Sequence, residues 1–279
     1  MALDAIDLRI GAGETVALLG PNGAGKSTAI SLMLGLLEPS AGGVSVLGRE
    51  PRAAVRSGRV GAMLQESGLP ALARVRELVE LVRNLSPRPM GTVDVLRRAG
   101  LTALAGRRTE TLSSGEQQRV RFALAIAGNP DLLFLDEPTV AMDVESRHAF
   151  WADMRSFAEE GRTILFATHY LEEADQVASR IVVLDRGRIV ADGTASQIKA
   201  ATRGRRRIAF RTDSTDGAVY RALPAVTAVA LRGDGAVLET TDSDATARAL
   251  FASDLAIRDV EISGPDLEDA FLALIADGA

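Results

Sequence analysis

Cysteine is absent from this chain, and histidine occurs only at His148 and His169. Without thiols the protein has no disulfide bond, no thiolate catalysis and no cysteine-based metal site, and two histidines are too few for a histidine-rich zinc site. The absence of cysteine fits a reducing cytosol. Lysine is also scarce, since Lys26 and Lys199 are the only two, and we interpret that scarcity as a compositional bias.

Long apolar runs are missing as well. No segment reaches the roughly 20 uninterrupted apolar residues of a membrane-spanning helix, and the best candidate, residues 29–37, is far too short. The first ten residues carry acidic charges and do not resemble a signal peptide. The net charge of −5 gives no reason to expect a nucleic-acid surface. These features predict a soluble chain, long enough at 279 residues for one large domain and one small one.

Glycines are concentrated directly after the apolar run 16–19, in the segment Gly20-Pro-Asn-Gly-Ala-Gly-Lys26-Ser27-Thr28. A strand, a glycine-rich turn and a helix form the context in which this pattern indicates a phosphate-binding loop. An ordinary strand-to-helix turn with an exposed lysine is the alternative. The candidate phosphate-binding residues are Gly20, Asn22, Gly23, Gly25, Lys26, Ser27 and Thr28.

Each residue type in this loop suits a phosphate chain. Glycines let successive backbone N–H groups curve around the phosphates, and the N-terminus of the following helix adds partial positive charge. Lys26 is expected to lie along the β- and γ-phosphates as a point charge. Ser27 is expected to ligate a Mg²⁺ ion that bridges phosphate oxygens, and Thr28 adds a further donor.

Strands and helices alternate along the first two hundred residues, which predicts an α/β fold. Residues 3–10 alternate apolar and polar, so we expect a hairpin that delivers the chain into a strand at 15–19, and residues 44–46 are expected to form another short strand. From 71 to about 108 the pattern is helical. Val75, Leu78, Val79 and Val82 share one face, which Val93, Leu96 and Leu104 continue after a break at 86–89. We interpret residues of about 66–120 as a helical insert.

The sequence pattern changes after an expected helix at 195–201 and a basic linker at 203–207. Short strands and helices follow without a phosphate or metal motif, which predicts a small α+β domain. We therefore divide the chain into a nucleotide-binding domain at 1–202 and a small accessory or regulatory domain at 203–279.

Polar residues follow several of the predicted strands. Asp136 and Glu137 come after the apolar strand 132–135, His169 follows the strand 163–167, and Gln65 follows the strand 59–63. Ligands in open α/β sheets gather at the carboxyl ends of strands, so paired carboxylates there indicate a site. A solvated loop acid is the alternative for Glu137, and a satisfied structural histidine is the alternative for His169.

In their order along the chain, these motifs resemble those of the ATP-binding cassette (ABC) family. The resemblance covers about residues 3–201 and rests on the phosphate loop, Gln65, LSSGEQQR at 112–119, LLFLDEP at 132–138 and Thr168-His169. The segments LEEAD at 171–175 and LEDAF at 267–271 also resemble the ATPase subunits of two-part bacterial exporters of the daunorubicin-resistance type.

The resemblance implies a P-loop NTPase cassette that binds ATP and Mg²⁺ and hydrolyses ATP. Asp136 would hold the Mg²⁺ ion together with Ser27 and Gln65, and Glu137 would polarise the attacking water. His169 would hydrogen-bond the γ-phosphate. The catalytic residues expected on this basis are Glu137, His169 and Gln65.

A second copy of the chain is implied as well. Ser113 and Gly115, at the start of a helix, would clamp the γ-phosphate bound by that copy, and Asp143 would lie in the loop that crosses the dimer interface. Ser114 and Glu116 depart from the family pattern, which commonly has glycine and glutamine there. A Cβ at position 114 hinders close backbone approach, and a carboxylate at position 116 repels phosphate.

The implied machine is a homodimer closed around two ATP molecules that powers a separate integral-membrane permease, as an exporter at the inner face of the cell membrane. No nucleic-acid partner is expected. A soluble ABC-type ATPase acting on the ribosome or another non-membrane partner is the alternative, although such proteins resemble two cassettes in tandem. Chromosome-maintenance ATPases are excluded, because they place a long coiled coil where only residues 66–112 intervene here.

The resemblance also places an aromatic residue, which stacks on adenine, in an edge strand upstream of residues 2–6. No aromatic residue occurs before Phe122, and Met1 directly precedes that segment. We therefore expect the natural start to lie further upstream. The alternative is that apolar side chains alone hold the adenine ring.

Overall fold

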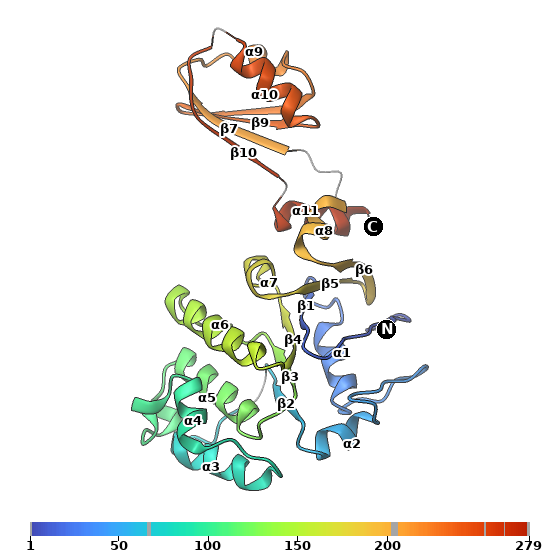
Figure 1. Ribbon diagram of the computed structural model, residues 1–279, viewed down its shortest axis with the longest axis vertical. Coiled ribbons are helices and arrows are strands. Elements are labelled where there is room, and N and C mark those ends of the chain that lie inside the picture. Colours follow the sequence, from blue (N-terminus) through green and yellow to red (C-terminus); the bar gives the residue numbers. More distant parts are fainter. Residues whose placement is uncertain (1, 66–67, 202–205, 254, 265, 278–279) are drawn as a thin grey trace. The chain divides into compact units, whose positions relative to one another are not determined.

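The structure is a computed structural model that describes residues 2–65, 68–201, 206–253, 255–264 and 266–277. The chain divides into two compact units, a first unit of residues 1–192 and a second unit of residues 193–279 (Figure 1). The sequence places the helix at 195–201 in the first domain. In the structure this helix, α8 (Ala195–Ala201), packs against α11 (Leu267–Asp277) and belongs to the second unit.

The first unit is built on a six-stranded sheet in the order β2-β3-β4-β1-β5-β6 (Figure 1). Strands β2, β3, β4, β1 and β5 run parallel to one another. Every residue of β1, β3 and β4 is buried, as expected of parallel strands covered on both faces. The strand bounds are β1 (Thr15–Leu19), β2 (Val60–Met63), β3 (Leu132–Asp136), β4 (Thr163–Thr168), β5 (Arg180–Asp185) and β6 (Arg188–Gly193).

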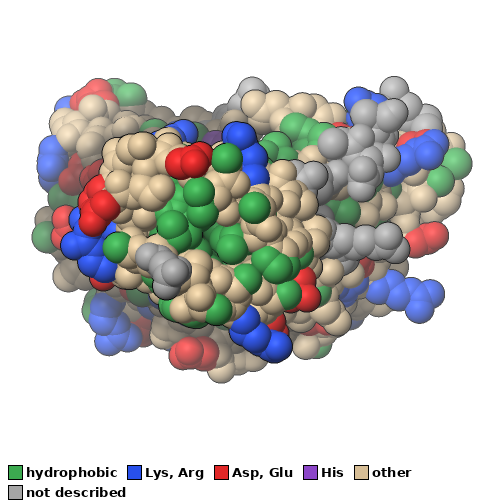
Figure 2. All heavy atoms as spheres, turned by 90° about the horizontal axis from the view of Figure 1, so that it is seen from above, with side chains coloured by type: hydrophobic (Ala, Val, Ile, Leu, Met, Phe, Trp, Pro, Cys, Tyr) green, Lys and Arg blue, Asp and Glu red, His purple; other side chains and the backbone are tan. Residues whose placement is uncertain are grey.

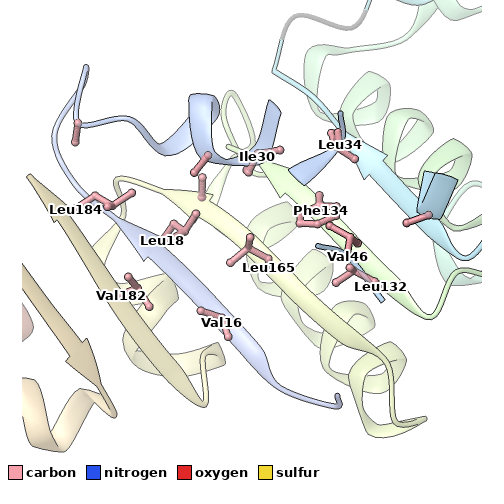
Figure 3. Close-up of a cluster of buried hydrophobic side chains, with 14 residues drawn as sticks. Val16, Leu18, Ile30, Leu34, Val46, Leu132, Phe134, Leu165, Val182 and Leu184 are labelled. Carbon is pink, nitrogen blue, oxygen red and sulfur yellow. The ribbon is translucent and has the colours of Figure 1, made fainter. Parts of the chain in front are cut away.

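Helices cover both faces of this sheet. On one face, α1 (Lys26–Met33) and α2 (Pro51–Arg56) contribute to a buried cluster in which alternate residues of the central strands point the same way (Figure 3). On the other face lies α6 (Val144–Glu159), whose Trp151 ring packs against Phe166 of β4 in a tilted arrangement with the ring centroids 4.7 Å apart. Helix α7 (Leu171–Val177) packs near β1 and β4. The predicted α/β architecture is confirmed.

A helical segment follows β2 and is formed by α3 (Val75–Leu85), α4 (Thr92–Arg98) and α5 (Ser114–Ile126), with 3₁₀ turns at Thr102–Leu104 and Thr109–Thr111. The break between α3 and α4 contains the predicted 86–89 stretch. Val75, Leu78 and Val79 are buried, but Val93 is 66% exposed, so its predicted place on the buried face is wrong. Leu96 is buried as predicted, and Val95 is buried in place of Val93 because the register of α4 turns that position inward.

Two short strands expected before β2 do not form. Residues 3–10 contain no strand, and their apolar side chains Leu3, Ile6, Leu8 and Ile10 pack as an irregular segment on the cluster of Figure 3. A strand needs a hydrogen-bonded neighbour, whereas β1 already lies between β4 and β5. Residues 44–46 are reduced to one isolated bridge between Val46 and Arg49.

The second unit contains a four-stranded antiparallel sheet in the order β10-β7-β9-β8. Its strands are β7 (Arg206–Thr212), β8 (Val226–Arg232), β9 (Gly235–Thr240) and β10 (Ile257–Ser263), and its further helices are α9 (Gly217–Arg221) and α10 (Ser243–Phe251). Ile208, Phe210, Tyr220, Leu238 and Leu250 form its core. Of the basic linker expected at 203–207, the first three residues lie outside the described residues and the last two belong to β7.

The outer surface mixes side chains of several kinds. Figure 2 shows one face on which hydrophobic side chains gather near the middle, with acidic and basic side chains around them. Within the described parts of the chain, no helix combines the length and the apolar character that are required to cross a membrane.

Candidate nucleotide site

The glycine-rich loop lies at the carboxyl end of β1 and leads directly into α1. Gly25 stands at the N-terminus of α1 with φ of 108°, a left-handed conformation that favours glycine. A Cβ at Gly20 would lie 2.3 Å from the carbonyl oxygen of Leu184, so only glycine fits this close approach. The loop therefore presents backbone amides at a helix N-terminus, which is the arrangement that binds anions.

Lys26 is the first residue of α1, and only 7% of it is exposed. Its Nζ donates hydrogen bonds to the carbonyl oxygens of Gly20 at 2.6 Å and Pro21 at 3.2 Å, so the ammonium lies back across the loop. Burial lowers the pKa of Lys26, while the charges of Glu137 and Asp136 raise it. Burial thus disfavours the charged form of Lys26, and the two carboxylates favour it.

Asp136 is the last residue of β3, and 4% of it is exposed. Burial raises the pKa of Asp136, while a hydrogen bond with Ser27 and the charge of Lys26 lower it. Its buried Oδ1 atom has no hydrogen-bond partner. A buried carboxylate oxygen without a partner is costly, and a hard cation is a ligand that would satisfy it.

This chemistry fits a magnesium ion held between protein and phosphate. Among the described residues, no three His, Cys, Asp or Glu side chains are grouped to hold a metal. Mg²⁺ commonly binds through one or two carboxylates plus substrate phosphates, which does not require such a group. Asp136 and the Ser27 hydroxyl are the residues that would supply the protein's part of that donor set.

Glu137 follows directly, with φ of 50° and its backbone N–H donating to the carbonyl oxygen of Ala167 at 2.9 Å. One carboxylate oxygen lies 2.8 Å from Nδ1 of His169. Burial raises the pKa of Glu137, and the neighbouring His169 and Lys26 lower it. The side chain of His169 is 45% exposed, so the pair joins a buried carboxylate to a ring at the surface.

Neighbouring strands explain why these residues meet. Strand β3 pairs with β4 so that Asp136 lies opposite Ala167, and β4 pairs with β1 so that Thr168 lies opposite Leu19. The carboxyl ends of the three strands therefore bring together Lys26, Ser27, Asp136, Glu137 and His169.

Outside the phosphate loop, the predicted residues Gln65, Ser113 and Gly115 do not join this contact group. Gln65 is exposed two residues beyond β2, and Gly115 lies in the first turn of α5. Ser113 caps that helix: its Oγ accepts a hydrogen bond from the N–H of Glu116 at 3.2 Å, and its own N–H donates to the Glu116 carboxylate at 2.7 Å. The structure thus binds the Glu116 carboxylate inside the helix cap.

Two contacts near the site involve residues to which the sequence assigned no role. Nε2 of Gln118 lies 3.5 Å from the carbonyl oxygen of Glu137, and the carboxylate of Glu173 contacts Thr168. Gln118 lies within the LSSGEQQR motif, which could have singled it out. Glu173 lies in a segment noted only for its resemblance, and nothing in the sequence indicated its burial.

Comparison with known proteins adds a family. A family model described as ABC transporter matches residues 3–140. A daunorubicin resistance ATP-binding protein of Streptomyces coeruleorubidus is 36% identical, with 99% of this chain and 92% of that protein aligned. A Nod factor export ATP-binding protein I of Rhizobium johnstonii is 40% identical, with 67% of this chain and 63% of that protein aligned.

Solved structures agree on the fold. A dimeric ATP-binding cassette in a post-hydrolysis state, bound to ADP and phosphate, is similar with a TM-score of 0.64 and 28% identity. That match covers 69% of this chain and 90% of the other. An ATP-binding subunit of an ABC transporter is similar with a TM-score of 0.65 and 27% identity, covering 72% and 86%.

Proposed function

The chain belongs to the family of ABC transporter ATP-binding proteins, and from this membership we propose that it is the ATP-hydrolysing subunit of a two-component exporter. One observation carries the proposal. Asp136 and Glu137, adjacent at the end of β3, are both buried, yet one contacts Ser27 and the other contacts His169. Two neighbouring carboxylates thus have separate partners, which suits one to a metal and the other to water.

ATP would be held through its phosphates. The amides of the loop from Gly20 to Gly25 and the Lys26 ammonium would bind the phosphate chain, and Thr28 would add a donor. Ser27, Asp136 and Gln65 would hold Mg²⁺, which when bound neutralises charge on the phosphate oxygens.

Glu137 would act on the attacking water. Its carboxylate would orient the water and accept its proton, and burial, which raises the pKa of Glu137, makes the carboxylate a stronger base. His169, hydrogen-bonded to Glu137 at 2.8 Å, would hold that carboxylate in place and reach the γ-phosphate with its exposed ring.

A second copy would complete each site, because Ser113 and the N-terminus of α5 lie outside the contact group of their own chain. Two such copies would form an isologous dimer around two ATP molecules. The dimeric state of one similar cassette supports this arrangement. The Ser113 amide holds the Glu116 carboxylate by a hydrogen bond, and its dipole partly offsets the repulsion that this carboxylate would exert on phosphate.

The dimer would act at the inner face of the cell membrane on a separate permease. The names of relatives involved in drug resistance and Nod factor export support an exporter. The alternative is a cassette protein that acts on the ribosome or another non-membrane partner. Such a protein would bind that partner instead of a permease.

Two measurements test this proposal. Purified full-length protein should release phosphate from Mg-ATP, and the affinity-tagged chain should copurify from detergent-solubilised cells with an integral membrane protein. Copurification with ribosomes would favour the alternative, and a folded protein that releases no phosphate from Mg-ATP would contradict both.

A further inference from the structure

Glu173 is a buried carboxylate close to the candidate site, on the first turn of α7. Its side chain is only 3% exposed, whereas its neighbour Glu172 is exposed. Oε2 accepts a hydrogen bond from the Thr168 hydroxyl at 2.7 Å, and Oε1 accepts one from the Thr139 hydroxyl. Both threonines are almost completely buried. One carboxylate therefore joins two hydroxyls from separate segments.

Each threonine lies close in sequence to one residue of the hydrogen-bonded pair Glu137 and His169, which we call the catalytic pair. Thr139 lies two residues after Glu137, in a turn where the N–H of Val140 donates to the Glu137 carbonyl oxygen at 3.3 Å. Thr168 directly precedes His169. Glu173 thus fixes the segment that carries the base and the segment that carries the histidine, which meet at 2.8 Å.

Arg147 of α6 balances the charge of Glu173 and reaches the same histidine by another route. Its Nε atom lies 3.5 Å from Oε1 of Glu173 and is buried without a hydrogen bond. Its guanidinium stacks 4.3 Å above the Tyr170 ring, and that ring stacks on His169 with centroids 4.1 Å apart. The Glu173 carboxylate, the Arg147 guanidinium and the Tyr170 ring therefore form one connected group next to His169.

A charge at this depth needs a reason, because a buried ion pair is often no more stable than well-packed apolar side chains. One carboxylate can accept hydrogen bonds from both hydroxyls, whereas an apolar side chain at this position would leave both hydroxyls without an acceptor. We propose that Glu173 is a positioning residue for ATP hydrolysis, which holds Thr139 and Thr168 and so keeps Glu137 and His169 at hydrogen-bonding distance. The inference rests on the function proposed above.

The test separates positioning from binding and from stability. Full-length wild type, Glu173→Ala, Glu173→Gln and the matched control Glu172→Ala are compared for phosphate release, equilibrium Mg-ATP affinity and melting temperature. A misplaced catalytic pair costs turnover, since displacements of about 1 Å reduce rates by up to ~100-fold. Glu173→Ala should therefore lower kcat by ~10–100-fold and change the Kd for Mg-ATP by less than about threefold.

The conservative variant Glu173→Gln distinguishes a positioning role from a packing role, because recovery of kcat depends on the hydrogen bonds that glutamine can still make. Glutamine still offers one acceptor and one donor, and threonine hydroxyls can pair with both, so Glu173→Gln should recover most of the lost kcat. Glu172→Ala should match wild type. The inference is overturned if folded Glu173→Ala retains kcat within about twofold, or if kcat and affinity fall together and Glu173→Gln is no better than Glu173→Ala.

Thr139→Val and Thr168→Val keep the inference testable should the Glu173 variants not fold. Each removes one hydroxyl and leaves the carboxylate paired with Arg147, so each should lower kcat with affinity unchanged. Wild-type kcat in both variants would overturn the inference. Glu137→Gln separates this failure from that of the proposed function: turnover abolished by Glu137→Gln but intact in both threonine variants would disprove only the role of Glu173.

Discussion

The two units bury different kinds of polar side chain. Among the residues of the first unit that the structure describes, the buried charged ones are Lys26, Asp136, Glu137, Glu173 and Asp185. Among the described residues of the second unit, the buried polar side chains are the hydroxyls of Thr212, Thr240, Ser243, Thr246 and Tyr220. These include two hydroxyl pairs, Thr212 with Tyr220 at 2.6 Å and Thr240 with Thr246 at 2.5 Å.

This difference separates chemistry from architecture. Buried charges reduce stability unless they are paired, so a fold retains them where a function requires them. Four of the five lie in or beside the candidate nucleotide site, at the carboxyl ends of parallel strands. The paired hydroxyls of the second unit join a strand to a helix and satisfy one another, as expected of structural contacts. We therefore propose that the second unit is an accessory or regulatory module.

The largest expected effect comes from a charge in the first unit. Glu137→Gln keeps the size of the side chain but removes the base, so turnover should fall by ~10²–10⁴-fold while ATP binding persists. Phosphate release and equilibrium binding measure the two quantities separately. Glu159→Gln, an exposed position on α6, serves as the control. Equal turnover in the two variants would remove Glu137 from the mechanism.

The two lysines offer a direct comparison between the units. Lys26→Ala removes a charged donor to phosphate and should weaken ATP binding by ~10–100-fold, because a hydrogen bond to a charged group contributes about 1.5–3 kcal/mol. Lys199→Ala, in α8 of the second unit, should leave the affinity unchanged. Titration with a fluorescent ATP analogue measures both, and a similar loss in both variants would argue against a special role for Lys26.

Removing the second unit should have a smaller effect on the site. A fragment that ends at Gly193 keeps β6 and should bind Mg-ATP within about twofold of the full chain, because the candidate phosphate and metal ligands all lie in the first unit. A fragment that ends at Ala201 also keeps α8 but removes α11, which exposes the buried Ile198. That longer fragment should be the less soluble one. A folded Gly193 fragment that cannot bind ATP would disprove the accessory role.

The smallest effect concerns the hydroxyl pairs. Tyr220→Phe removes one partner of Thr212 and should lower the free energy of unfolding of the second unit by about 1 kcal/mol. ATP turnover should not change. Chemical denaturation followed alongside phosphate release tests both parts, and a loss of turnover without a loss of stability would place Tyr220 in the mechanism and end the contrast between the units.

The candidate site could be predicted from the sequence because its parts are local. Glycines, lysine and carboxylates each stand at the end of an apolar strand, and the parallel sheet then brings these ends together. The resemblance to the ABC family, drawn from these same motifs, is confirmed by the relatives.

What the sequence could not predict depends on long-range contacts. The alternation at 3–10 suits a half-buried irregular segment as well as a strand, and only the available neighbours decide between them. Helix α8 joins the second unit through α11, about seventy residues later. The sequence around Glu173 suits an exposed acidic residue. Its burial depends on contacts with Thr139, Thr168 and Arg147, which lie in other segments of the chain.

In the cycle that we propose, two copies close around ATP and turnover at Glu137 opens them. Light scattering of purified Glu137→Gln protein, with and without Mg-ATP, tests it most directly. We predict a monomer without nucleotide and twice that mass with Mg-ATP, while the Lys26→Ala Glu137→Gln double variant stays monomeric. A Glu137→Gln protein that binds Mg-ATP yet remains a monomer would contradict the account.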